Sequence, residues 1–279
     1  MTPLELLGVL LAGTVAGAVN TIVGAGTLLT FPLLVALGVP PLVANVSNTV
    51  GLVPAAVTGA WGYRRELAGR WRVVARMAAY STVGSVVGAV LLLVAPADTF
   101  TSVVPWLLLL AAGLAAAQPR ISASLRRRES LAALAAGTSL ADDDGEDPAE
   151  APPAVADRVT RPLTPGLALG IAATGVYGGY FGAAQGVILL TMLGIWWSAD
   201  LHRANGAKVV LAGMANLVGG AIFVFSGEVD WAIAALIAVG SAAGGVLGAR
   251  LGRRIPAPVL RVVIVVAALA AAVALWVRG

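Results

Sequence analysis

The chain has 279 residues, of which 59% are hydrophobic and only 11% are charged, and its formal net charge is +4 at pH 7. A soluble domain usually carries about 25% charged residues, so this composition, with apolar runs near twenty residues from end to end, predicts an all-α polytopic membrane protein. With no cysteine and a single histidine, the chain lacks the residues for disulfides, thiolate metal ligands or a multi-histidine metal site.

Ten apolar segments are predicted in chain order. They lie at residues 4–20, 27–38, 42–62, 73–95 and 101–118, and then at 163–180, 187–197, 206–226, 231–249 and 258–277. A helix needs about 20 residues to cross the hydrocarbon core, so the second segment of each half is too short to span it. Short, glycine-interrupted segments at matching positions of two halves are typical of transporter binding sites. The pattern leaves open whether residues 4–38 and 163–197 cross fully or form re-entrant hairpins.

Matching glycines indicate an internal repeat. Glycines at 8, 17 and 24 recur 158 residues later, and those at 59, 84 and 88 recur 160 residues later. We therefore predict two membrane repeats of about five segments each, residues 1–118 and 163–279.

Arginine clusters predict the orientation of the repeats. They lie in the loop at 63–72, in the hydrophilic stretch at 119–162 and near 250–257. Positively charged loops stay in the cytoplasm, so we expect all three there. The loop at 63–72 is then inside, whereas its counterpart at 227–230, which holds Glu228, is outside. The halves are thus predicted to be inverted in a plasma membrane, with both termini outside.

The hydrophilic stretch at 119–162 is predicted to be a flexible cytoplasmic linker. Its centre, residues 142–150, is acidic and precedes two prolines, so it cannot bury enough apolar surface to become ordered. A regulatory or partner-binding segment is the alternative interpretation.

Two glycine-rich stretches, 17–27 and 175–186, interrupt the apolar pattern. Glycine lets a ligand approach the backbone closely, and a half-helix that begins at such a break points its free N–H groups and positive dipole end toward the midplane. We therefore predict that the two breaks face each other and bind a small anion. Close packing of helices by small residues is the alternative. The expected substrate-binding residues here are Asn20, Thr21, Gly24, Gly26, Thr27, Tyr177, Gly182, Gln185 and Gly186.

Lys208 is the only lysine among the 18 Lys and Arg residues. A charge within a membrane segment is costly and usually faces a cavity or a partner, so we expect Lys208 to bind the anion as a point charge. A lysine that snorkels to the interface is the alternative. Its counterpart in the first repeat is Asn48, which we add to the predicted site together with Thr49. These two could instead cap a helix.

Several functions lack support in the sequence. No carboxylate lies in the middle of a predicted segment, so proton coupling is not evident. No paired carboxylates, histidine cluster or activated nucleophile indicates an enzyme, and we expect no cofactor. The arginines are spread over several loops, which favours contact with the lipid bilayer over nucleic-acid binding. A homo-oligomer is left open.

Three groups of residues carry a family resemblance. The first is Ala-Gly-x-x-Asn-Thr-Ile-Val-Gly-x-Gly at residues 16–26, followed by a short apolar run with Pro32 and then Leu-Gly-Val-Pro-Pro at 37–41. The second is the Ser-Asn pair at 47–48, which leads to Tyr-Arg-Arg at 63–65. The third is Gly-Gly-x-Phe-Gly at 178–182, followed by Ala-Asn-Gly-Ala-Lys at 204–208. The chain thereby resembles the TauE/SafE family of sulfite exporters (the 4-toluene sulfonate uptake permease family). The resemblance implies transport, often export, of sulfite, sulfonates or related small sulfur-containing anions. A carrier of another organic anion, such as a carboxylate, and a passive anion channel are the alternatives.

Overall fold

The computed structural model describes residues 1–135, 160–251 and 257–278. Over these residues the chain is helical, and an isolated bridge between Thr160 and Ser198 is its one β-type pairing. Six of the described helical stretches are long and apolar enough to cross a membrane. The predicted all-α polytopic membrane fold is therefore confirmed.

The helices follow the predicted segments in order. The first half contains α1 (Pro3–Ile22), α2 (Thr27–Ala36), α3 (Pro41–Gly51), α4 (Val53–Gly62), α5 (Trp71–Val94) and α6 (Ala97–Ala135). The second half contains α8 (Pro165–Tyr180), α9 (Gln185–Trp196), α10 (Leu201–Val224), α11 (Trp231–Leu251) and α12 (Ala257–Arg278). The predicted segment 42–62 is one membrane-length stretch that is interrupted at Leu52, because Pro54 begins the new helix α4.

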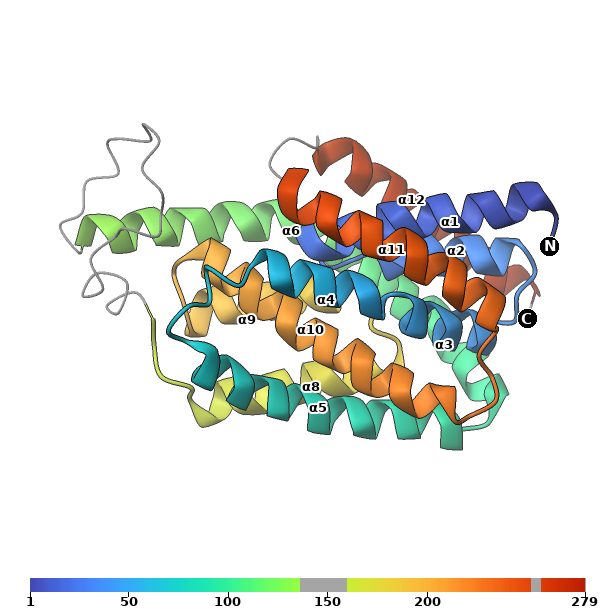
Figure 1. The fold of residues 1–279 in the computed structure, drawn as a ribbon, viewed down its shortest axis with the longest axis horizontal. Coiled ribbons are helices and arrows are strands. Elements are labelled where there is room, and N and C mark those ends of the chain that lie inside the picture. Colours follow the sequence, from blue (N-terminus) through green and yellow to red (C-terminus); the bar gives the residue numbers. More distant parts are fainter. Residues whose placement is uncertain (136–159, 252–256, 279) are drawn as a thin grey trace.

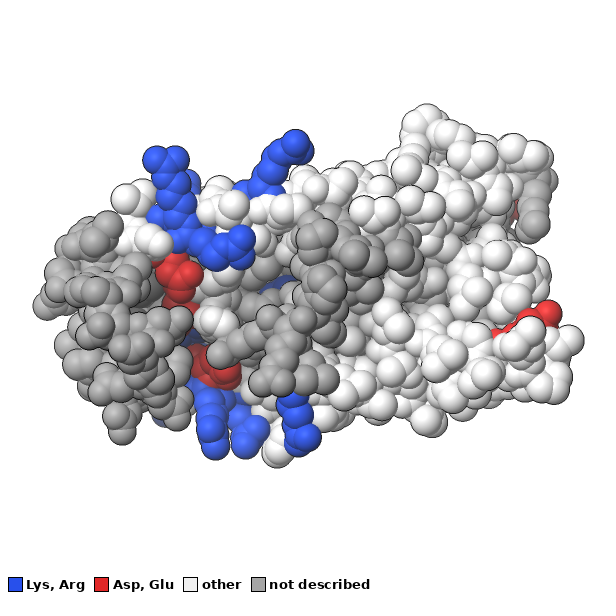
Figure 2. All heavy atoms as spheres, turned by 90° about the horizontal axis from the view of Figure 1, so that it is seen from above, with Lys and Arg blue, Asp and Glu red and all other residues white. Residues whose placement is uncertain are grey.

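The helices run mainly along one axis (Figure 1). α1 begins and α12 ends toward the same end of the molecule, whereas α6 projects from the opposite end. On the face shown in Figure 2, the Lys and Arg side chains gather toward one end, followed by a broad belt without charged side chains. An uncharged belt beside an arginine-rich end is the surface expected of a protein that spans a bilayer.

α2 and α9 form hairpins with the helices that precede them. They have 10 and 12 residues, or about 15 and 18 Å at 1.5 Å per residue, which is less than the roughly 30 Å of a hydrocarbon core. In Figure 1, α2 returns to the end at which α1 begins, and α9 returns to the end at which α8 begins. The N–H of Arg161, before α8, donates to the carbonyl of Trp197, after α9, at 2.7 Å.

α6 extends well beyond its predicted end at residue 118. The helix continues through Pro119 to Ala135, so the first part of the predicted linker is helical rather than flexible. The rest of that linker up to residue 159, including its acidic centre, lies outside the described residues, as do residues 252–256.

Packing explains the long α6. Leu125 is buried against Gly194 of α9, and the carboxylate of Glu129 accepts a hydrogen bond from the N–H of Leu201 at 3.2 Å. The first turn of α10 leaves that N–H without a partner inside the helix, so Glu129 acts as a cap from another element. These tertiary contacts outweigh the helix-breaking tendency of the proline.

Matching contacts recur in the two halves. α1 packs on α11, and α8 packs on α5. The hydroxyl of Ser81 in α5 donates to the carbonyl of Leu211 at 3.0 Å, and that of Ser241 in α11 donates to the carbonyl of Gly51 at 2.7 Å. The two donors are 160 residues apart, and so are the two acceptors, which is the spacing that relates the glycines.

Glycines let these helices approach closely. A Cβ atom placed on Gly84 would overlap the carbonyl oxygen of Ala172, and one on Gly244 would overlap that of Thr14. The contacting residues are again related by the spacings 160 and 158. Close backbone contact at small residues is a common way for membrane helices to associate.

Candidate functional site

The break between α1 and α2 and the break between α8 and α9 have the same backbone geometry. α1 ends where the N–H groups of Val23 and Gly24 both donate to the carbonyl of Val19. α8 ends in the same way, with two N–H groups that donate to the carbonyl of Tyr177. Gly24 and Gly182 then turn the chain in the left-handed region, at φ +82° and +73°. Glycine adopts this conformation without the steric cost that a Cβ brings.

The two breaks meet, as predicted. The N–H of Gly186 donates to the carbonyl of Gly24 at 3.1 Å. A Cβ atom on either glycine would overlap the Cα of the other, so the two backbones touch directly. Residues from the two halves of the chain therefore form one centre.

Lys208 lies beside this centre and is fully buried. Its Nζ donates to the carbonyls of Thr21 at 3.1 Å and Ile22 at 3.4 Å, which are at the end of α1. The last carbonyls of a helix have no partner within it and carry partial negative charge, so a cation is favourable there. Lys208 is thus not a snorkelling lysine. It holds the end of α1 from within the bundle.

Asn48, the counterpart of Lys208, also joins two helices. Its amide nitrogen donates to the hydroxyl of Thr27 at 3.3 Å, and its carbonyl oxygen accepts a hydrogen bond from Thr30. Asn48 therefore links α3 to the first turn of α2. The hydroxyls of Thr49 and Thr21 instead donate to carbonyls of their own helices, at 2.9 and 3.0 Å.

The polar residues of the second break are tied to α8 and to the break itself. Gln185 donates from its amide nitrogen to the carbonyl of Thr174 at 3.1 Å, and the hydroxyl of Tyr177 donates to the carbonyl of Ala183 at 2.5 Å. In the first break, Asn20 is half-buried and lies beside Gly26. Most of the predicted residues thus lie in the two breaks, and Asn48 and Lys208 hydrogen-bond to the helices beside the first break, whereas the hydroxyl of Thr49 bonds within α3. Many of the polar groups already have protein partners.

The start of α9 differs from the prediction of free N–H groups. The N–H groups of Gln185, Gly186 and Val187 donate to the carbonyls of Gly182, Gly24 and Ala184, at 3.2, 3.1 and 3.0 Å. Buried N–H groups need partners, and the tight turns of this break bring carbonyls within reach. An anion at the start of α9 would therefore have to replace these hydrogen bonds.

A polar cavity of about 300 Å³ lies next to the predicted site, toward the arginine-rich end. Its wall combines the end of α1, the turn after α4, the extension of α6 and parts of α9, α10 and α11. The lining residues are Ile22, Gly62, Tyr63, Glu66, Gln118, Ser122, Arg126, Leu190, Leu201, His202, Asn205, Gly248 and Ala249.

This cavity was not predicted, because the fifth apolar segment was expected to end at residue 118. Residues 118, 122 and 126 recur every four positions, so they form one face of a helix that continues past Pro119. That four-residue spacing of Gln, Ser and Arg is the signal that could have revealed the wall.

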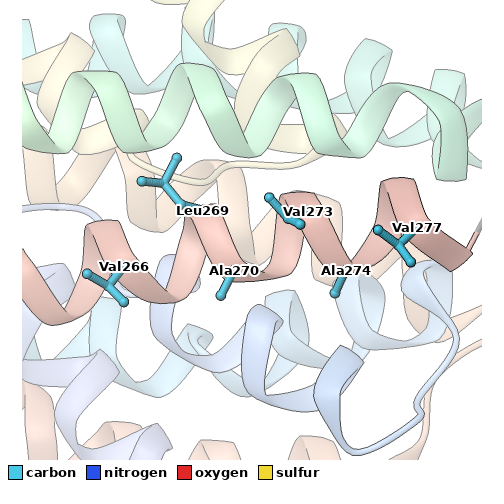
Figure 3. Close-up of a pocket in the computed structure, with 6 residues that line it drawn as sticks. All are labelled: Val266, Leu269, Ala270, Val273, Ala274 and Val277. Atoms are coloured by element: carbon cyan, nitrogen blue, oxygen red, sulfur yellow. The ribbon is translucent and has the colours of Figure 1, made fainter.

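A second hollow is an apolar groove on α12 (Figure 3). It is lined by Val266, Leu269, Ala270, Val273, Ala274 and Val277. None of these side chains can orient an anion, and several are exposed, so the groove fits acyl chains of lipid better than a polar ligand.

Comparison with known proteins agrees with the motifs. The family model described as "Sulfite exporter TauE/SafE" matches residues 9–275. A "Probable membrane transporter protein" of Haemophilus influenzae is 24% identical over 243 residues, which cover 85% of this chain and 82% of that protein. No solved structure gives a significant match. The family match covers both helix breaks, Lys208 and the polar cavity, and the chain therefore belongs to the sulfite exporter TauE/SafE family.

Proposed function

We propose that this membrane transporter carries small sulfur-containing anions, such as sulfite or organosulfonates, out of the cell by alternating access. The observation that carries the proposal is the meeting of the two breaks beside Lys208. A buried lysine and two turns that bring the backbones of both halves together are converging features suited to a small oxyanion.

The paired contacts support inverted repeats as the basis of the transport cycle. The hydrogen bonds of Ser81 and Ser241 are related by one spacing, and the first helix of each hairpin packs on a long helix of the other half. In transporters with such repeats, one unit moves against the other around a fixed site. We place the arginine-rich end in the cytoplasm, which puts both termini outside.

Transport in proteoliposomes tests the proposal. Purified protein is reconstituted, and uptake of sulfite, ethanesulfonate and acetate is followed with and without the same anion inside. Saturable uptake of sulfite or ethanesulfonate that is accelerated by internal substrate is expected of a carrier. Uptake of acetate alone would indicate a carboxylate carrier, and large flux without saturation or counterflow would indicate a channel.

A further inference from the structure

Two residues that line the polar cavity each have a buried acceptor oxygen without a donor. Oε2 of Glu66 and Oδ1 of Asn205 are buried and have no hydrogen-bond partner, and both residues line the cavity. Buried acceptors in folded proteins are normally paired with a protein donor, an ordered water or a ligand. A ligand that fits this wall should therefore bring N–H or O–H donors.

The charges of the cavity narrow the choice of ligand. Its described wall contains the carboxylate of Glu66 and the guanidinium of Arg126. An anion without a donor group would face Glu66 unfavourably, and a simple cation would face Arg126 unfavourably. A small molecule with both an ammonium and an anionic group complements both residues, and about 300 Å³ is enough space for one.

The cavity also adjoins the predicted anion site. Ile22 lines it, and the carbonyl of Ile22 accepts a hydrogen bond from Lys208. Asn205 lies three residues before Lys208, on the same side of α10. A ligand in the cavity is thus separated from the two breaks by the end of α1.

We infer that this cavity binds a small zwitterion, with its ammonium group at Glu66 and Asn205 and its anionic group toward Arg126. The inference rests on the proposed function and deepens it, because it assigns amino-substituted sulfonates as preferred ligands over plain ones. The ammonium group donates to the two unpaired oxygens, and no covalent step is involved.

Three matched ligands test the inference on the full-length protein in detergent. 2-Aminoethanesulfonate carries both charges, ethanesulfonate lacks the amine, and ethylamine lacks the anion. Calorimetric titration of the wild-type protein should give a dissociation constant for the first that is at least tenfold lower than for either of the others. Glu66→Gln should remove most of this preference and should strengthen rather than weaken ethanesulfonate binding, because the variant lacks the carboxylate that a plain anion faces unfavourably. Glu228→Gln, an exposed change after α10 on the opposite side, is the control and should retain the preference.

The outcomes separate this inference from the proposed function. Equal affinity of the wild-type protein for 2-aminoethanesulfonate and ethanesulfonate would overturn the proposed zwitterion site. That result would still be compatible with transport of sulfur-containing anions. A preference that persists in Glu66→Gln would overturn the role of Glu66. If Glu66→Gln does not fold, Asn205→Ser is titrated with the same ligands as the wild-type protein. A preference for 2-aminoethanesulfonate that is unchanged in Asn205→Ser would then overturn the ammonium site. Absence of binding and transport for sulfite and for both sulfonates would overturn the proposed function itself.

Discussion

The Nζ of Lys208 donates to the carbonyl oxygen of Thr21 at 3.1 Å, so the one lysine of the chain joins the second half of the protein to the end of α1. The contact gives a buried charge a structural partner while holding it beside the two breaks. The structural role of Lys208 and its proposed role in anion binding can be separated experimentally.

Replacement of Lys208 by methionine should affect both properties. The variant keeps most of the aliphatic stem but leaves the carbonyls of Thr21 and Ile22 without this donor, which should lower the free energy of unfolding by about 1–3 kcal/mol. Affinity for sulfite should fall at least tenfold, or about 1.4 kcal/mol. Thermal unfolding and calorimetry measure the two effects, with the exposed change Arg72→Gln as control. Unchanged sulfite affinity in a destabilised variant would assign Lys208 to structure alone.

The glycine pair at the centre can be tested with alanine. Gly24→Ala places a Cβ on a residue at φ +82° and also against the backbone of Gly186, so it should destabilise the fold most. Gly186→Ala brings only the steric overlap with Gly24. Gly38→Ala, at φ +84° in open space, isolates the conformational cost of about 1–2 kcal/mol. Gly113→Ala, in a helix and in open space, should be neutral or stabilising by up to about 1 kcal/mol. The free energies of unfolding should follow this order, and equal losses at Gly24 and Gly38 would contradict close contact of the breaks.

The repeated serine hydrogen bonds predict matched losses. Ser81→Ala and Ser241→Ala each remove one buried donor to a carbonyl of the other half, so each should lower the free energy of unfolding by about 1 kcal/mol. Chemical unfolding of the two variants and of the exposed control Ser124→Ala provides the comparison. A large loss at one serine and none at the other would argue that the two contacts are not equivalent.

Thiol labelling can test which side of the path is open. The natural chain has no cysteine, so Asn205→Cys and Asn45→Cys each introduce a unique thiol. Asn205 lines the polar cavity, whereas Asn45, 160 residues earlier, is fully buried and donates to the carbonyl of Tyr180 at 3.0 Å. A membrane-impermeant maleimide should therefore label position 205, from the cytoplasmic side only, at least tenfold faster than position 45. Comparable rates at both positions would contradict this one-sided access.

Much of the helical pattern could be predicted because apolar length and glycine breaks are local properties. The segments predicted at 73–95 and 231–249 correspond closely to α5 and α11. The contact between the two helix breaks was also predicted, because the breaks occupy matching positions in the two halves. The continuation of α6 past residue 118 could not be predicted in this way, because Pro119 is a local signal that ends helices. The contacts of Leu125 and Glu129 outweigh that signal, and both are made with the other half of the chain.

The candidate site was predicted less completely for the same reason. Lys208 stood out by composition, but its partners are backbone carbonyls, which no sequence pattern marks. Glu66 and Asn205 are far apart in the chain, and only the packing of the turn after α4 against α10 brings them to one cavity. The unpaired oxygens that distinguish them are a property of the folded protein.

The contact of Gly24 with Gly186 limits how evolution can change this protein. At this contact backbone meets backbone, and there is no side chain to exchange. New substrate preferences within such a scaffold must therefore arise from neighbours that can vary, such as Asn48, Gln185 or the residues of the polar cavity.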